Sequence, residues 1–233
     1  FGDALRVPGS RKSLMQAKAD SADIRIVYSP MDALQLARAE PAREVVFFGL
    51  GFETTMPSTA LTVLQAEREG VANFSVFCNH ITIVPTIKAV LDSPDLKIDG
   101  FLGPGHVSMV IGTAPYAFVA RHYRRPLVVA GFEPLDILQS IWMVLRQLAE
   151  GRAEVENQYA RIVPAGGNAA ALDAVARVYE LREFFEWRGL GSIDHSGLRF
   201  RAAYARFDAE RRFAVPGVRI ADPKSCQCGE VLK

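Results

Sequence analysis

The chain has 233 residues, of which 49% are hydrophobic and 23% are charged, and its formal net charge is +1. These values are ordinary for a globular protein with one large or two small domains. They give no reason to expect binding to nucleic acid or to a membrane surface. No apolar run approaches the roughly 20 residues that cross a bilayer, so we expect a cytoplasmic protein.

The sequence predicts strands and helices in alternation. In its first half the expected elements are a helix at 13–19, a strand at 23–28, a helix at 31–40, a strand at 44–50, a helix from 57, a strand at 73–78 and a helix at 85–91. In its second half they are a strand at 98–102, a helical stretch broken at Gly112 and restarted at Pro115, a strand at 126–130, a helix at 135–148, a strand at 158–163 and a helix at 168–184.

Alternating strands and helices imply parallel pairing with right-handed crossovers. We therefore expect an α/β fold with two similar parallel-sheet βαβαβα domains that face each other across a cleft. The expected domains are 1-94, whose amino-terminal part is missing, and 95-186. Residues 187-233 form a carboxyl-terminal extension that cannot bury much by itself, so we expect it to dock on this body or on a segment outside the chain.

Two Gly-Phe-Glu corners are the most distinctive feature of the sequence. Glu53 and Glu133 each follow a buried strand and precede a helix. Such corners lie at the carboxyl ends of parallel strands, where α/β proteins bind their ligands. Each glutamate can cap the helix that follows it. Alternatively, it can face the crevice as a general base or hydrogen-bond acceptor.

A glycine-rich loop with a histidine, GPGHVS at 103–108, follows the strand at 98–102. Gly103 and Gly105 let the backbone approach a ligand closely, and Ser108 is expected to cap the helix. His106 sits at the helix start, where it can serve as a ligand, donor or acceptor. The alternative interpretation is a structural turn with a surface histidine. The loop contains neither phosphate-binding glycine pattern.

The three cysteines are too few for a disulfide framework, so the roles to consider for them are metal binding and redox chemistry. Cys78 ends a strand beside His80, where most cysteines are small buried hydrophobic residues, so His80 is the better candidate at this edge. Cys226 and Cys228 form a Cys-x-Cys that can supply two thiolates to one metal or cluster. Two thiolates do not close a four-cysteine site.

These motifs together resemble one family, the hydrogenase maturation factors called HypD. The segments that carry the resemblance are GFETT (51–55), GPGHVS (103–108), VVAGFEPLDIL (128–138), WRGLG (187–191), FDAE (207–210) and CQCGEVLK (226–233). The chain begins at Phe1 and stops shortly after the Cys-x-Cys. We therefore interpret it as a fragment that lacks both ends of the family pattern.

The resemblance implies a role in assembling the Fe(CN)2CO moiety of [NiFe]-hydrogenases. Members of this family hold that iron together with the chaperone HypC, receive cyanide from the HypE–HypF system, and carry a [4Fe-4S] cluster near the carboxyl end. The fold implied is two similar α/β domains with a cluster-binding region, here partial. The main iron ligands are then expected upstream of Phe1, and the remaining cluster ligands beyond Lys233.

Transferred by motif, the resemblance assigns roles to residues of this chain. His106, Glu53 and Glu133 would act in the central cleft, His106 as a polar partner or proton relay and the glutamates as orienting groups. Cys226 and Cys228 would bind the cluster. The residues expected to line the cofactor site are Gly51, Thr54, Thr55, Gly103, Gly105, Ser108 and Gly131.

Three functions remain open at this point. The first is a maturation scaffold with redox capability rather than a conventional turnover enzyme. The second is a two-domain α/β enzyme that binds a small metabolite in the interdomain cleft. The third is an interaction module without a redox role.

Overall fold

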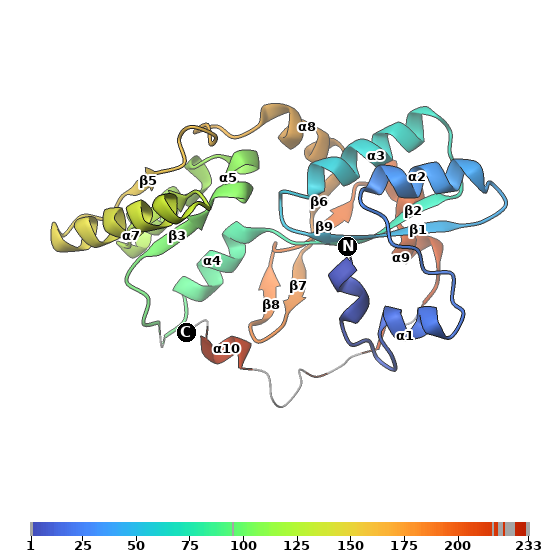
Figure 1. The fold of residues 1–233 in the computed structure, drawn as a ribbon, viewed down its shortest axis with the longest axis horizontal. Coiled ribbons are helices and arrows are strands. Elements are labelled where there is room, and N and C mark those ends of the chain that lie inside the picture. Colours follow the sequence, from blue (N-terminus) through green and yellow to red (C-terminus); the bar gives the residue numbers. More distant parts are fainter. Residues whose placement is uncertain (1, 95, 216, 219–220, 222–226, 232–233) are drawn as a thin grey trace.

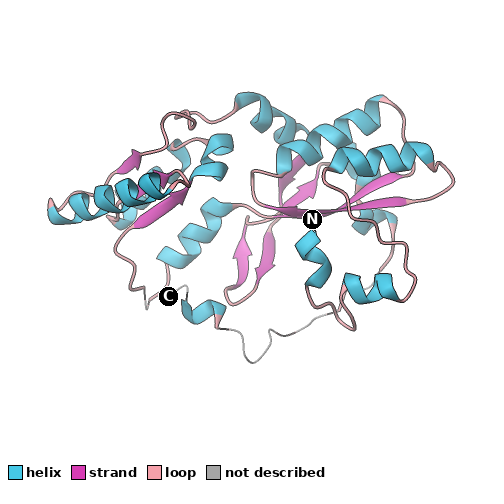
Figure 2. Cartoon of the chain, viewed as in Figure 1, coloured by secondary structure: helices cyan, strands magenta, loops and turns pink. Residues whose placement is uncertain are grey.

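Two separate parallel sheets form the framework of the molecule (Figures 1 and 2). The computed structural model describes residues 2–94, 96–215, 217–218, 221 and 227–231. The first sheet pairs β1 (Val45–Gly51) with β2 (Phe74–His80). The second sheet has the order β3-β4-β5 and contains β3 (Phe101–Pro104), β4 (Leu127–Ala130) and β5 (Val155–Asn157). An α/β fold with parallel strands is thus confirmed.

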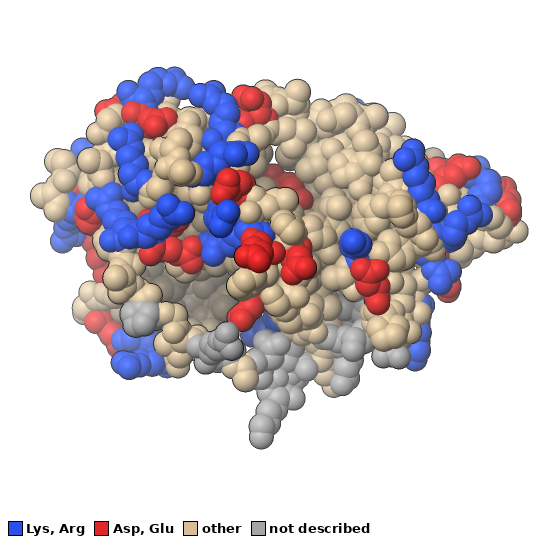
Figure 3. All heavy atoms as spheres, turned by 180° about the vertical axis from the view of Figure 1, so that it is seen from behind, with Lys and Arg blue, Asp and Glu red and all other residues tan. Residues whose placement is uncertain are grey.

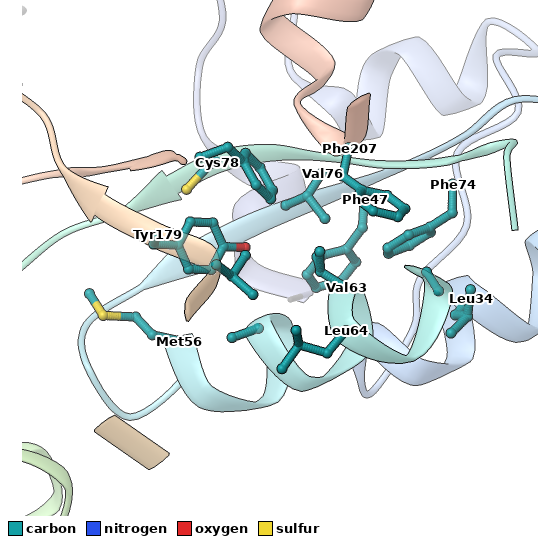
Figure 4. Packing of buried hydrophobic residues seen from close by; sticks show 14 of the residues in the cluster. Leu34, Phe47, Met56, Val63, Leu64, Phe74, Val76, Cys78, Tyr179 and Phe207 are labelled. Atoms are coloured by element: carbon teal, nitrogen blue, oxygen red, sulfur yellow. The ribbon is translucent and has the colours of Figure 1, made fainter. Parts of the chain in front are cut away.

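The first sheet packs against helix α2 (Pro30–Ala39), and helix α3 (Met56–Arg68) shares its core. Helix α2 begins with a capping box, in which the Ser29 hydroxyl accepts from the N–H of Asp32 and the Asp32 carboxylate accepts from the N–H of Ser29. The apolar faces of both helices and the sheet form the first core (Figure 4). Its buried residues include Leu34, Phe47, Met56, Val63, Leu64, Phe74, Val76, Cys78, Tyr179, Phe200 and Phe207.

The second sheet has its own core. Helix α4 (Ile83–Leu91) follows β2 and places Ile87 and Leu91 in this second core, together with Tyr116, Val119, Leu127, Val129 and Val163. The other helices of this half are α5 (Gly105–Ile111), the 3-10 helix η2 (Ala114–Tyr116), α6 (Ala117–Tyr123) and α7 (Pro134–Ala149). The interruption expected at Gly112 is confirmed, because this glycine ends α5 with a φ of 77°.

The chain returns to the first core after the second sheet. Helix α8 (Ala169–Val178) packs on α3, and its Ala174 and Val178 belong to the first core. Two antiparallel pairs follow, β6 (Tyr179–Leu181) with β9 (Leu198–Phe200), and β7 (Phe184–Trp187) with β8 (Gly191–Asp194). The remaining elements are η1 (Gly2–Arg6), α1 (Leu14–Ala19), η3 (Ala202–Phe207), α9 (Ala209–Arg212) and α10 (Cys228–Val231). Phe200 and Phe207 of the extension lie in the first core, so this described part of it docks on the α/β body. The domain limits at 94 and 186 stay a prediction.

Three predicted elements differ from the structure. The strand expected at 23–28 is wrong, because this segment has no ladder partner and Arg25 is instead held by Asp23 and Glu40. The strand expected at 158–163 is also wrong, since β5 ends at Asn157 and a turn follows. The helix expected at 168–184 ends at Val178, where the chain becomes extended to pair Tyr179 with Phe200.

Charged side chains are interspersed over the surface. Acidic and basic groups lie side by side on the face shown in Figure 3. Arg152, for example, pairs with Glu150, Glu154 and Glu156. Within the ranges that the structure describes, no helix has both the length and the apolar character needed to cross a bilayer.

The first core should dominate stability. Phe74 is fully buried between the sheet and its helices, whereas Leu61 on α3 is 54% exposed. Phe74→Ala is expected to lower the free energy of unfolding by about 3–5 kcal/mol because it removes buried area and leaves a cavity. Leu61→Ala is the matched control and should change it by less than about 0.5 kcal/mol. Urea denaturation measures both, and equal losses would contradict this description of the core.

Candidate functional site

The first corner turns its glutamate inward. Strand β1 ends at Gly51, whose φ of 123° favours glycine. Glu53 is only 7% exposed, and its Oε1 accepts a hydrogen bond from the N–H of Ile83 at 3.0 Å. Glu53 therefore caps α4, a helix 30 residues further along the chain, and not the helix that follows the corner.

Burial raises the pKa of the Glu53 carboxyl above its ordinary value, and the hydrogen bond from Ile83 offsets part of that rise. The second oxygen, Oε2, is buried without a hydrogen-bond partner among the described residues. A carboxyl group in this setting favours the protonated form more than an exposed glutamate does, so it can hold a proton in the interior.

The rest of the first corner is held by local hydrogen bonds. The Thr55 hydroxyl lies 3.1 Å from the carbonyl oxygens of both Leu50 and Phe52, and Thr54 is exposed. A Cβ on Gly51 would stand 2.6 Å from the Thr55 oxygen, so the turn requires glycine for space as well as for φ.

Cys78 and His80 lie inside the protein. Cys78 is 2% exposed, its thiol donates to the Leu198 carbonyl at 3.6 Å, and burial raises its pKa to about 11. The interpretation of Cys78 as a small buried residue is confirmed. His80 is fully buried, its Nε2 lies 3.1 Å from the Thr59 hydroxyl, and burial lowers its pKa to about 4. Both groups are neutral at pH 7, and neither reaches the surface.

The glycine-rich loop brings β3 close to β4. A Cβ on Gly103 would meet the Leu127 side chain at 2.9 Å, and one on Gly105 would stand 2.3 Å from the Ala130 carbonyl oxygen. The cap expected from Ser108 is wrong, because this residue lies inside α5. Its hydroxyl instead donates to the carbonyl of Pro104 at 2.8 Å and lies 3.2 Å from the Tyr116 hydroxyl.

His106 is exposed on the first turn of α5. Its ring stacks on Phe132 of the second corner, with centroids 3.9 Å apart and an interplanar angle of 26°. Phe132 meets the ring of Tyr159 edge-on at 6.4 Å, and the Arg161 guanidinium lies 4.6 Å above that ring. This stack fixes the position of an imidazole that remains open to solvent.

At the second corner the exposed and buried acids have different roles. The Glu133 side chain is 79% exposed and lies 3.8 Å from Arg161. Asp136, three residues later, is 5% exposed and accepts both arms of the Arg161 guanidinium, at 2.8 and 2.5 Å. These bonds hold the pKa of Asp136 well below its usual range. Gly131 must be glycine, since a Cβ there would stand 2.1 Å from the Asp136 Oδ2.

The predicted site residues thus fall into two groups. His106, Glu133 and Gly131 gather at the exposed second corner, around Phe132. Glu53 and Ser108 are buried, and the Ser108 hydroxyl lies 3.2 Å from that of Tyr116. Burial is the main factor that raises the Tyr116 pKa to about 12, and the Glu53 charge adds to this rise.

Sequence reasoning missed Tyr116, Phe132, Asp136 and Arg161. Phe132 and Asp136 lie within the repeated corner motif and its continuation, whereas no pattern in the sequence pointed to Tyr116 or Arg161.

The structure describes one of the two predicted cluster cysteines. Cys228 is exposed at the start of α10. Cys226 lies outside the described residues. In that described part of the chain, no group of three or more His, Cys, Asp or Glu side chains is placed to hold a metal ion.

Comparison with known proteins gives consistent matches. Residues 1–233 match the family model of HypD, described as the hydrogenase formation hypA family. Hydrogenase maturation factors HypD from Rhodobacter capsulatus, Escherichia coli K12 and Cupriavidus necator H16 are 66%, 56% and 51% identical to the chain. Each alignment covers 100% of this chain, but the chain spans only 62–63% of the length of these relatives.

Burial of His80 predicts a specific pH dependence. The unfolded chain binds a proton on this histidine below about pH 6.5, whereas the folded protein binds it only near pH 4. The unfolded state therefore holds more protons between these values, and stability falls as the pH is lowered through this window. The full shift corresponds to roughly 3 kcal/mol. Urea denaturation between pH 4 and 7 should show a shallower decline for His80→Gln than for the wild type. Identical declines would contradict a buried neutral His80.

The cap formed by Glu53 predicts different effects of two substitutions. Glu53→Gln keeps an acceptor for the Ile83 N–H and removes a charge that is costly to bury, so stability at pH 7 should be equal or higher. Glu53→Ala removes the acceptor and should cost about 1–3 kcal/mol. Urea denaturation at pH 7 compares the two, and a Gln variant as unstable as the Ala variant would show that the cap is not formed as described.

Proposed function

The chain belongs to the HypD family of hydrogenase formation proteins, and on that premise we propose that it forms part of a maturation scaffold for [NiFe]-hydrogenases. In this proposal the whole protein acts in the cytoplasm and holds iron while the Fe(CN)2CO moiety is assembled. A HypC-type chaperone shares the iron, and a HypE-containing complex supplies cyanide. The names of relatives at 51–66% identity support the hydrogenase maturation role.

The observation that carries the proposal is the stacked His106 at the second corner. An exposed imidazole that stacks on Phe132 is oriented by that ring and keeps its nitrogens open to solvent, so they can donate to or accept from a polar ligand on the iron. Glu133 beside it is exposed and can turn toward the same cargo. We assign His106 the role of polar partner or proton relay and Glu133 that of an orienting group.

The interior residues hold the helices that adjoin the two corners. Glu53 holds the start of α4, and Ser108 ties α5 to Pro104 and Tyr116. The glycines at 51, 103, 105 and 131 allow the close approaches on which both corners depend. Thr54 is exposed and available to a ligand, and Thr55 closes the first turn. We propose that the two sheets are the centres of two α/β domains, and that these corners face a shared cleft.

The [4Fe-4S] cluster remains a proposal that rests on the Cys226–Cys228 spacing and on the family resemblance. The described residues contribute Cys228 and do not complete a ligand set for a cluster, so they do not fit the group by themselves. We therefore derive no step through the cluster. We propose that its remaining ligands, and the main thiolate ligands of the iron, come from outside the residues of this chain.

Replacement of His106 tests the proposal. The variants are placed in the full reading frame and expressed in a host whose own gene for this factor has been deleted. His106→Ala should lower hydrogenase activity roughly 100-fold, as expected for the loss of a group that positions or moves a proton. The protein level, measured by immunoblot, should remain unchanged because the side chain is exposed.

His122→Ala is the matched control, since His122 is an exposed histidine on α6 outside the second corner. It should support normal maturation. Full activity with His106→Ala would contradict the role proposed for the second corner.

A further inference from the structure

The ring of Tyr159 lies between two glycines of the candidate site. Tyr159 follows β5, in the turn that stands where a strand was expected at 158–163. A Cβ on Gly105 would stand 3.0 Å from the Cδ1 atom of this ring, and a Cβ on Gly131 would stand 2.8 Å from its Cδ2 atom. Each glycine therefore leaves room for one edge of the same tyrosine ring.

These two glycines directly precede the two stacked rings of the site. His106 follows Gly105, and Phe132 follows Gly131. A ring that lies between the glycines thus sets the separation of the two backbone segments from which the stacked side chains extend. The stack is sensitive to that separation, because its ring centroids are only 3.9 Å apart and attraction between packed atoms falls steeply with distance.

Tyr159 also contacts the stack directly. Its ring meets the ring of Phe132 edge-on, with centroids 6.4 Å apart and an interplanar angle of 80°. This is the arrangement that two aromatic rings favour when they do not lie parallel. Phe132 therefore contacts one aromatic ring on each of two sides, His106 in parallel and Tyr159 at an edge.

Tyr159 has contacts of its own that hold it in place. Its N–H donates to the carbonyl of Val129 at 3.3 Å, which ties the turn to β4. The Arg161 guanidinium lies 4.6 Å from the centroid of its ring. Asp136 in turn binds that guanidinium through two hydrogen bonds. The ring is thus packed against a cation that a buried carboxylate keeps in position.

The neighbouring Gln158 fastens the same turn to the second corner. Its side-chain oxygen accepts a hydrogen bond from the N–H of Gly131 at 3.1 Å, and its side-chain nitrogen donates to Asp136 at 2.8 Å. The turn after β5 therefore binds the backbone immediately before Phe132. Because the turn and the corner are joined in this way, a displacement of Tyr159 would be felt at Phe132.

We propose that Tyr159 is a positioning residue for His106, whose ring spaces the two segments so that the imidazole stacks on Phe132. Tyr159 acts through these neighbours and does not contact the cargo. The inference rests on the proposed function, because it deepens the role given there to His106. It also gives the glycines at 105 and 131 a common purpose, since both make room for one ring.

The chemical shifts of the His106 ring protons report the stack, because a proton above an aromatic face resonates upfield. The full reading frame is prepared with isotope-labelled histidine, and the His106 signals are identified by their absence from the spectrum of His106→Gln. Phe132→Leu changes a side chain that is 55% exposed and gives the shifts of the unstacked imidazole. Tyr159→Leu should move the His106 signals most of the way to those values.

Tyr159→Phe tests whether the ring is the part that matters, because the contacts described above involve the ring and the backbone and not the hydroxyl. It should keep the His106 signals at their wild-type positions. If Tyr159→Leu lowers the level of soluble protein, Tyr159→Met replaces it, since a flexible apolar side chain fills similar space without a ring.

Hydrogenase activity in the deletion host gives the functional readout. Tyr159→Leu should lower it about tenfold or more, as expected when a working group is displaced, and Tyr159→Phe should restore it. Tyr123→Leu is the matched control, because Tyr123 on α6 is also a partly buried aromatic residue packed against the second core. It lies outside the second corner, so it should change neither the His106 signals nor the activity.

His106 signals that stay in place in Tyr159→Leu would overturn the positioning role and leave the proposed function intact. Equal displacement of these signals in Tyr123→Leu would also overturn it, because the effect would then be a general loss of packing. Displaced signals with normal activity, alongside an inactive His106→Ala, would show that the stack is not needed and overturn it as well. Normal activity in His106→Ala would instead refute the proposed role of His106, and the positioning role with it.

Discussion

One hydrogen bond connects the first corner to the second half of the molecule. Glu53 follows the end of the first sheet, and its carboxyl group accepts a hydrogen bond from the N–H of Ile83 at the start of α4. Further along α4, Ile87 and Leu91 lie in the second core. The first N–H groups of a helix have no partner within the helix, so a buried acceptor at that point fixes where the helix begins. The position of α4 thus depends on a side chain from the other sheet.

The two corners share a sequence but not a chemistry. Glu53 is buried, whereas Glu133 is exposed. The buried acid at the second corner is Asp136. The difference follows from the neighbouring residues. At the first corner Glu53 is bonded to the start of α4, whereas at the second corner Arg161 binds the buried Asp136. A repeated motif therefore predicts a repeated backbone turn and does not predict equal exposure of its side chains.

Local patterns in the sequence predicted local structure well. The corners, the parallel strands before them and the break at Gly112 follow from short motifs and glycine chemistry. The segment 23–28 shows the limit, since its alternating pattern has no partner strand in the structure. The stack of His106 on Phe132 joins residues 26 positions apart, and no pattern in the sequence specifies such a contact. The apolar periodicity likewise predicted the helix at 135–148, but it did not predict that Asp136, Ser140 and Gln147 are its buried residues.

Hydrogen exchange at the Ile83 amide tests most directly the claim that the Glu53 carboxyl holds the start of α4. Two-dimensional NMR of the folded protein, with and without Glu53→Ala, gives the exchange rate of that single amide. The structure predicts strong protection in the wild type, although this amide has no acceptor within its own helix, and a large loss of protection in the variant. An Ile83 amide that exchanges in the wild type as rapidly as an exposed amide would contradict the account.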